Sequence, residues 1–177
     1  MIRRHRGFIL LNVLGGAAIL GSYAWGFLAR PEEAALLWGG VPMSLRPFYT
    51  ACMPLAAVGY FFFTAYFLTR VDPRRPVLVG GTGWGLLHGL YAAFLVASAL
   101  WLPLTVLLIR EPSDALWIVI RIVLAVVGLA AVGLLVVLLA SDLDRSGWLF
   151  PAAVGGLVAF CLQTAVLDAL VWPHYFR

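Results

Sequence analysis

Three ionisable side chains lie inside long apolar stretches of this 177-residue sequence: His88, Arg121 and Asp168. A group that can carry charge is costly to place among apolar neighbours, so such residues are default candidates for a functional site. An imidazole, a guanidinium and a carboxylate could together hold a polar ligand or move a proton. The structural alternatives are a histidine hydrogen-bonded between helices and an arginine whose long side chain extends to the membrane surface.

Arg121 and Asp168 fall in the last two apolar stretches, which would run antiparallel as helices. Both residues lie toward the same end of these helices. Their depths differ by about one or two helical turns, which an arginine side chain can partly bridge. We therefore predict an Arg121–Asp168 ion pair, which would either anchor a ligand or only join the two helices.

His88 is predicted to lie in a polar pocket near the middle of the membrane. It follows the start of its apolar run by about twelve residues, which places it roughly 18 Å deep. Tyr91 shares its helix face, and Tyr60 and Gln163 fall at a similar depth on other helices. These four side chains could bind a ligand, with hydrogen bonding between helices as the alternative. No spacing typical of a zinc site occurs, and we expect no metal and no cofactor.

Five apolar runs must position these residues. The chain is 63% hydrophobic and 11% charged, whereas soluble domains carry about 25% charged residues. A membrane-spanning helix needs about 20 apolar residues. We predict an all-α bundle of five transmembrane helices in a single membrane domain, over residues 7–28, 47–68, 77–102, 113–140 and 148–171.

Prolines set the expected limits of two of these helices. The third run stays apolar to residue 109, so Pro103 marks either a kink or a helix end near Leu102. Pro173 is expected to close the last helix.

The first loop is long enough for a short helix of its own. Its Pro31-Glu32-Glu33 sequence is typical of a first helical turn, where proline is tolerated and carboxylates face the positive helix end. Gly39-Gly40 would end that helix. We predict a short interfacial helix in this outer loop.

Gly81, Gly85 and Gly89 form a small-xxx-small series in the third run. A bare helix face of this kind lets another backbone approach closely. We predict close packing there, against another helix of the chain, with a second copy as the alternative.

Arginine placement predicts the orientation. All twelve basic residues are arginine, and seven of them fall on the side that carries the N-terminus. Because basic residues favour the cytoplasmic side, we predict a cytoplasmic N-terminus and a C-terminus on the opposite face, in a bacterial-type inner membrane.

Several function classes are disfavoured. The absence of lysine excludes a Schiff base, and scattered arginines argue against nucleic-acid binding. There is no phosphate-binding loop, nucleophile elbow, HExxH or CxxC motif. We favour a protein that binds, with or without transport, a small apolar or lipid-like ligand in the bilayer. The alternatives are an accessory subunit or homo-oligomer of a membrane complex, and an intramembrane enzyme acting on a lipidic substrate.

The helix count and the 14% aromatic content resemble those of the translocator/tryptophan-rich sensory proteins, whose bundles bind porphyrins and sterols. The resemblance does not extend to that family's Trp- and Pro-rich motifs, because Trp38 and Pro42 alone do not make up such a motif. It implies only that a five-helix bundle can hold an apolar ligand.

Overall fold

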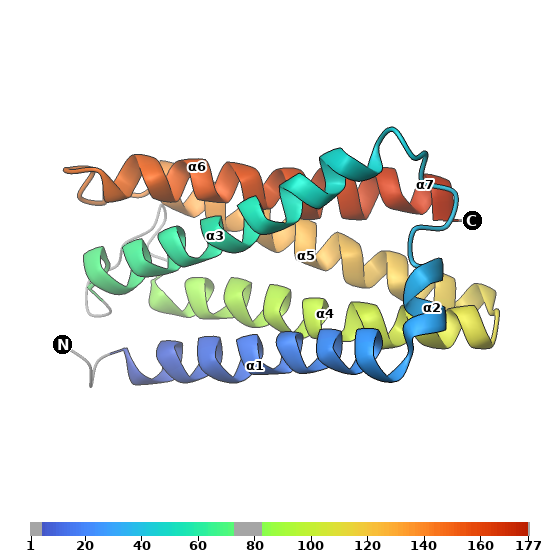
Figure 1. Cartoon of the computed structure of the whole chain (residues 1–177). Coiled ribbons are helices and arrows are strands. Elements are labelled where there is room, and N and C mark those ends of the chain that lie inside the picture. The colour runs from blue at the N-terminus through green and yellow to red at the C-terminus, as the bar shows by residue number, and fades with distance from the viewer. Residues whose placement is uncertain (1–4, 73–82, 177) are drawn as a thin grey trace.

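Each of the five apolar runs folds as one long helix. The computed structural model describes residues 5–72 and 83–176, and within these ranges it contains helices and no strands (Figure 1). Five of the described helices are long and apolar enough to cross a membrane, which confirms the predicted all-α bundle. The first four are α1 (Arg6–Ala29), α3 (Arg46–Arg70), α4 (Trp84–Arg110) and α5 (Asp114–Ala140), and the fifth consists of α6 (Leu149–Cys161), the π-helix η3 (Leu162–Val171) and α7 (Trp172–Phe176).

The bundle has two distinct ends. α1 begins at one of them and α7 finishes at the other (Figure 1). We call these the N-terminal end and the C-terminal end.

α4 differs from its predicted limits at both ends. It begins at Trp84, with Gly83 as its N-cap, whereas the apolar pattern predicts a start at residue 77. Residues 73–82, which include Gly81, lie outside the described part of the chain. The helix passes through Pro103 and ends at Arg110, so an end near Leu102 is wrong. In a membrane bundle, neighbouring groups can satisfy the backbone atoms that an internal proline frees.

The last span continues past Pro173 to Phe176, so the prediction that this proline closes the helix is wrong. The ten residues of η3 are wound as a π-helix, in which an N–H bonds the carbonyl five residues back. The Trp172 N–H accordingly donates to the Leu167 carbonyl. Pro173 has no N–H to contribute, and the chain continues as one more helical turn.

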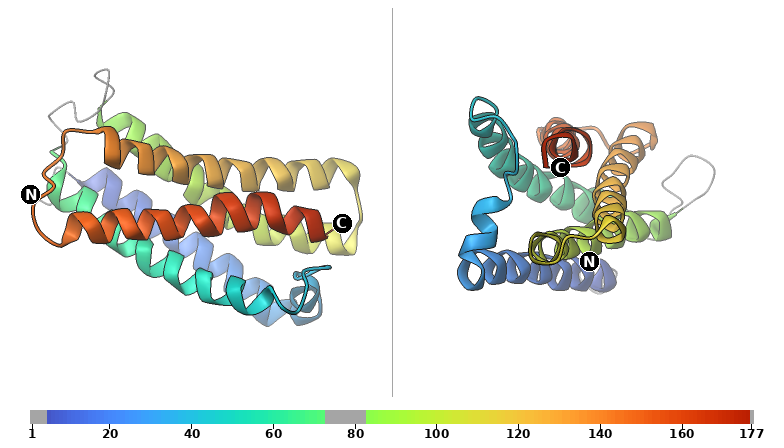
Figure 2. Two further views of the ribbon diagram at one scale, coloured as in Figure 1. Left: turned by 90° about the horizontal axis from the view of Figure 1, so that it is seen from above. Right: turned by 90° about the vertical axis from the view of Figure 1, so that its right-hand side faces the viewer.

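α2 (Pro31–Leu36) confirms the predicted short helix in the first loop. It crosses the C-terminal end of the bundle between α1 and α3 (Figures 1 and 2). The loop that follows is fastened to the last helix by two hydrogen bonds. Trp172 Nε1 donates to the Leu37 carbonyl at 2.8 Å, and the Gly40 N–H donates to the Tyr175 carbonyl at 2.8 Å.

Two glycines let this loop lie against the last helix. Gly39 has a φ of +50°, a conformation that favours glycine. A Cβ at Gly39 would lie 2.9 Å from the Cα of Phe176, and one at Gly40 would lie 2.7 Å from the carbonyl oxygen of Tyr175. The helix itself ends earlier, at Leu36 with Leu37 as its C-cap, so the prediction that the glycine pair ends it is wrong, and the pair instead permits close contact with the last span.

The closest helix packing occurs between α3 and α6. A Cβ at Gly59 would lie 2.5 Å from the carbonyl oxygen of Gly156, and one at Gly156 would lie 2.7 Å from the Cα of Gly59. The two backbones are therefore in direct contact. α1 packs on α4 in a related way, with the Leu95 side chain placed directly over Gly15.

Gly85 and Gly89, two members of the predicted glycine face on α4, do not pack against the described part of the chain. A Cβ at Gly85 or Gly89 would meet no atom of the described residues within 4 Å. The intrachain prediction is wrong for these two glycines because α4 turns its opposite face, with Leu87 and Tyr91, into the core. Gly85 and Gly89 are exposed at the surface of the bundle.

The N-terminal end is closed by contacts between α3 and the loop before α6. Arg70 Nη1 lies 2.6 Å from Asp144 Oδ2, and the Tyr66 hydroxyl donates to the Asp144 carbonyl at 2.7 Å. Hydrogen bonds from Ser146, followed by the positive charge of Arg70, lower the pKa of the Asp144 carboxyl.

Candidate functional site

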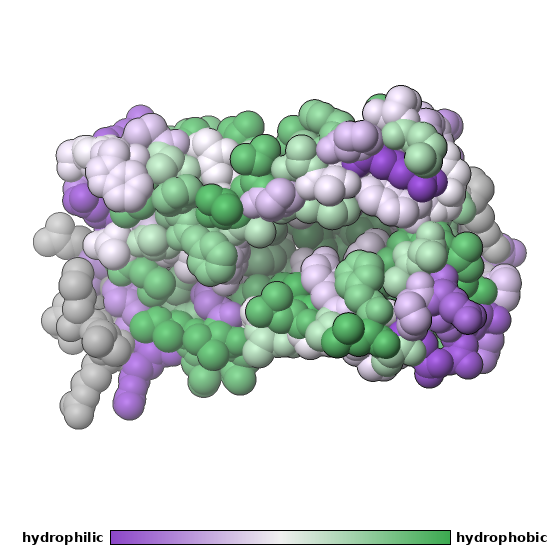
Figure 3. All heavy atoms as spheres, in the orientation of Figure 1, coloured by the Kyte–Doolittle hydropathy of each residue, from purple (hydrophilic) through white to green (hydrophobic). Residues whose placement is uncertain are grey.

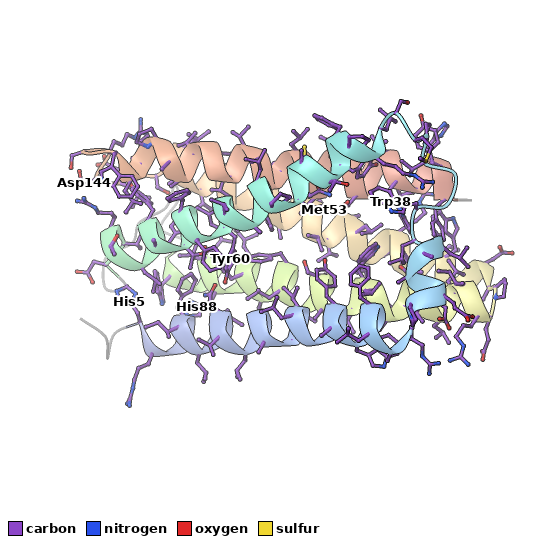
Figure 4. The ribbon with its side chains drawn as sticks, in the orientation of Figure 1. His5, Trp38, Met53, Tyr60, His88 and Asp144 are labelled. Atoms are coloured by element: carbon purple, nitrogen blue, oxygen red, sulfur yellow. The ribbon has the colours of Figure 1, made fainter. Side chains whose placement is uncertain are left out.

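The structure separates the four residues predicted to share a pocket. His88 lies one turn into α4, near the N-terminal end, and not in the middle of the bundle (Figure 4). The predicted depth is wrong because α4 begins at Trp84. His88 Nδ1 donates to the Trp84 carbonyl at 3.0 Å, and its ring packs against that of Phe8 at 5.4 Å between centroids. These contacts hold the start of α4 against α1.

Tyr60 and Tyr91 belong to a polar cluster that joins three helices. The Tyr60 hydroxyl donates to Asn12 Oδ1 of α1 at 2.6 Å, and Asn12 Nδ2 donates to the Phe8 carbonyl at 2.7 Å. The Thr64 and Tyr91 hydroxyls lie 3.0 Å apart, and either can donate. The chain itself supplies partners for these groups, so the cluster fastens α3 to α1 and α4.

Replacing Tyr60 by phenylalanine is expected to lower the free energy of unfolding by about 0.6 kcal/mol, the average worth of a hydrogen bond between membrane helices. The Asn12 side chain keeps its bond to the Phe8 carbonyl. Unfolding by denaturing detergent measures the change. In a double-mutant cycle, Tyr60→Phe and Asn12→Ala should be less than additive. Strict additivity would contradict the bond.

Aromatic rings fill the bundle between this cluster and the C-terminal half. Phe160 of α6 packs on Phe63 and Phe94, with ring centroids 5.5 and 5.4 Å apart. Gln163 lies about one turn beyond Phe160 along the last span. Gln163 therefore belongs to a different polar group from Tyr60, Tyr91 and His88.

Gln163 is bonded to Asp168. Its Nε2 donates to Asp168 Oδ1 at 2.8 Å. The predicted Arg121–Asp168 pair is not formed. The ion pairs among the described residues are Arg70–Asp144 and Arg110–Glu33. Arg121 lies on an exposed face of α5. The carboxyl of Asp168 thus has an amide partner and no basic partner in this part of the chain.

The π winding brings Gln163 and Asp168 onto one face of the last span. In an α-helix, residues five apart point about 140° away from each other. In a π-helix, the backbone bonds join residues five apart, so their side chains come close together. Short π segments in helices are frequent at functional sites, and this ten-residue one carries both polar side chains.

The carboxyl of Asp168 lies near enough to both α1 and α3 for its charge to reach them. Its charge acts on the hydroxyl groups of both Tyr23 of α1 and Tyr49 of α3. The Tyr49 hydroxyl also donates to the Leu167 carbonyl at 2.9 Å, which ties α3 to the π-helix beside the site. The indole ring of Trp101 completes the group, since it lies 6.4 Å from the ring of Tyr23.

Two polar atoms at this site have no partner among the described residues. They are Gln163 Oε1 and Trp101 Nε1, and both atoms are buried. Only 6% of the Gln163 residue surface is exposed. Buried polar groups are normally hydrogen-bonded, so the free acceptor of Gln163, whose own N–H bonds Asp168, distinguishes this place from the satisfied Tyr60 cluster.

The surface is hollowed where α1 and α3 diverge. The two helices separate toward the C-terminal end, and α2 crosses between them (Figures 1 and 2). α1 packs chiefly against α4, while α3 packs chiefly against α6. Figure 3 shows the resulting hollow on the face between α3 and α1. We call the group of Tyr23, Tyr49, Trp101, Gln163 and Asp168, which come from α1, α3, α4 and the last span, the lateral site.

Sequence reasoning found two members of the lateral site and missed three. Gln163 and Asp168 stood out as polar residues in an apolar run, whereas no sequence pattern distinguishes Tyr23, Tyr49 and Trp101 from the other aromatic residues. The separation of α1 from α3 is a tertiary feature that no local pattern reports.

Comparisons with known proteins add no assignment. No protein-family model, no curated protein and no solved structure matches this chain. The proposals below therefore rest on the chemistry of the site.

Proposed function

We propose that this membrane protein binds a small amphipathic, lipid-like ligand at the lateral site, with its polar head against Asp168 and Gln163. The observation that carries the proposal is a buried glutamine that bonds the half-buried carboxyl of Asp168 and keeps a free acceptor atom, Gln163 Oε1, in an otherwise apolar bundle whose side is hollowed between α1 and α3. Polar groups within membrane segments are costly and tend to mark substrate sites.

The arrangement of polar and apolar groups favours such a ligand. A polar head could satisfy Gln163 Oε1, while an apolar tail would extend into the surrounding lipid. Ligand sites generally combine apolar walls with a few placed polar groups. Entry from the side would let a lipid-like molecule reach the site without leaving the bilayer.

The orientation completes the proposal. We place the N-terminus on the cytoplasmic side of a bacterial-type inner membrane, as the arginine distribution predicts. The lateral site then lies in the half of the bilayer farther from the cytoplasm, because Asp168 is in the last third of the last span.

Native mass spectrometry tests the proposal on protein taken from its host membrane directly into nanodiscs. We expect a retained small molecule in the natural protein, and its loss in Gln163→Leu, which keeps the size of the side chain and removes its polar atoms. Gly85→Ala is the matched control, because a Cβ there meets no atom of the described residues within 4 Å. A protein without a small molecule, or one whose adduct survives in Gln163→Leu, would contradict the proposal.

A subunit role is the second candidate, and one observation favours it. Gly85 and Gly89 form a bare face on α4 that packs against nothing in the described chain. Glycine faces of this kind join helices of separate chains in membranes. A defined homo-oligomer or a retained partner chain, with no small molecule, would support this role in the same experiment.

A further inference from the structure

We propose that the head group bound at the lateral site is a protonated amine with N–H donors, carried on an apolar chain. This inference rests on the proposed function and specifies the ligand class. It joins three observations: a carboxyl without a basic partner, a free amide oxygen beside it, and surrounding aromatic rings.

The carboxyl of Asp168 defines the charge that would suit the site. Among the described residues the two ion pairs involve Arg70 and Arg110, which lie at the two ends of the bundle. A carboxylate inside a membrane segment needs a counter-charge or must give up its own charge. A ligand cation would supply that counter-charge, whereas a carboxylate or phosphate head would be repelled.

The hydrogen-bonding groups favour donors on the ligand. Asp168 receives one bond, from Gln163 Nε2, and so keeps further lone pairs free. Gln163 Oε1 makes no bond within the described chain. An ammonium group with two or three N–H donors could bond to both acceptors at once, which a quaternary ammonium cannot do. Trp101 Nε1 remains able to donate to an oxygen near the amine.

Aromatic rings on the neighbouring helices also suit a cation. The ring of Trp101 is steeply inclined to those of Tyr23, at 88°, and Trp172, at 74°. Trp172 follows Asp168 by four residues, so it lies one turn farther along the last span. Cations are attracted to the faces of such rings, tryptophan above all.

The test compares three probes with one twelve-carbon chain: dodecylamine, dodecanol and dodecyltrimethylammonium. Each is added to the purified protein in phosphatidylcholine nanodiscs at pH 7, where an alkylamine is protonated because its pKa is near the value of about 10.4 for lysine. Native mass spectrometry counts the probe retained per protein. We expect dodecylamine to bind at least about tenfold more tightly than either other probe, the equivalent of about 1.4 kcal/mol.

Asp168→Asn separates the charge from the shape of the site. Asparagine still offers an oxygen to Gln163 Nε2, so the fold should be kept. We expect the variant to lose the preference for dodecylamine and to bind dodecanol as before. Glu32→Gln is the matched control, since it removes an exposed carboxylate from α2 at the same end of the bundle. It should change neither the preference for dodecylamine nor the binding of dodecanol.

The outcomes distinguish this inference from the proposed function. Equal retention of dodecylamine and dodecanol, with both lost in Gln163→Leu, would overturn the amine and support the site. Equal retention of dodecylamine and dodecyltrimethylammonium would overturn the role of the N–H donors. If the protein keeps its host-derived adduct but retains none of the three probes, the amine proposal is overturned and the ligand site is not. If it retains neither a probe nor a host-derived adduct, both proposals fail.

Discussion

Gly59→Ala is expected to lower the free energy of unfolding by about 3 kcal/mol, the upper part of the range for overpacked cores. The added Cβ would lie 2.5 Å from the carbonyl oxygen of Gly156 and 2.7 Å from its Cα. Both obstacles are backbone atoms of another helix, so no side-chain rotation can relieve the clash. α3 and α6 must move apart, and the aromatic contact between Phe63 and Phe160 would be lost with them.

Gly85→Ala supplies the control for this prediction, because it makes the same change on a helix face that meets nothing within 4 Å in the described chain. Alanine favours a helix over glycine by about 1 kcal/mol, so this variant should be as stable as the natural protein or more so. Thermal unfolding of both variants in one detergent measures the difference. Equal unfolding temperatures for Gly59→Ala and Gly85→Ala would show that α3 and α6 do not meet at this point.

These two glycines also show what a sequence pattern can report about packing. The series at residues 81, 85 and 89 has the regular spacing of a packing motif, and its described members lie on an open face. Gly59 has no glycine four residues away, and yet it is in direct contact with the backbone of another helix. A motif describes one helix face, whereas packing needs a matching face on a second helix. Here that face is supplied by Gly156, about a hundred residues later in the chain.

The helices themselves were predictable because each depends on local composition. The runs that become α1, α3 and α5 fold within two residues of their predicted limits. Errors occur where backbone geometry departs from the regular α-helix. The depth of His88 depends on where α4 begins, and the pairing of Asp168 depends on the π winding of η3.

The sequence predicted only part of the lateral site, because its assembly also depends on the π winding. An apolar run makes Gln163 and Asp168 conspicuous, but their spacing of five predicts opposite faces of an α-helix. The sequence suggested Arg121 as the partner of Asp168 instead, since both residues fall toward the same end of two antiparallel helices. The wider helix provides an amide instead and leaves the carboxyl without a basic partner in the described chain.

Phe8→Ala is expected to loosen α1 from the bundle. Phe8 is fully buried, although α1 as a whole is the least enclosed of the five spans. Its ring contacts those of Tyr91, Trp84 and His88, with centroids 4.5, 5.2 and 5.4 Å away. Few other side chains of α1 are buried, so this one carries much of the attachment.

The expected loss is on the order of 2 kcal/mol in the free energy of unfolding. Replacing a buried phenylalanine costs about 3–5 kcal/mol in soluble proteins, where part of the cost is the return of apolar surface to water. In a bilayer the separated helix meets lipid instead, so mainly the cost of the cavity and of the lost ring contacts applies. Leu10→Ala on the same helix is the control, because Leu10 is 58% exposed. Thermal unfolding should separate the two variants. If both unfold at the same temperature, α1 is not anchored by Phe8. The contacts of α1 farther along, at Gly15 and Gly26, would then have to hold Tyr23 in place at the lateral site.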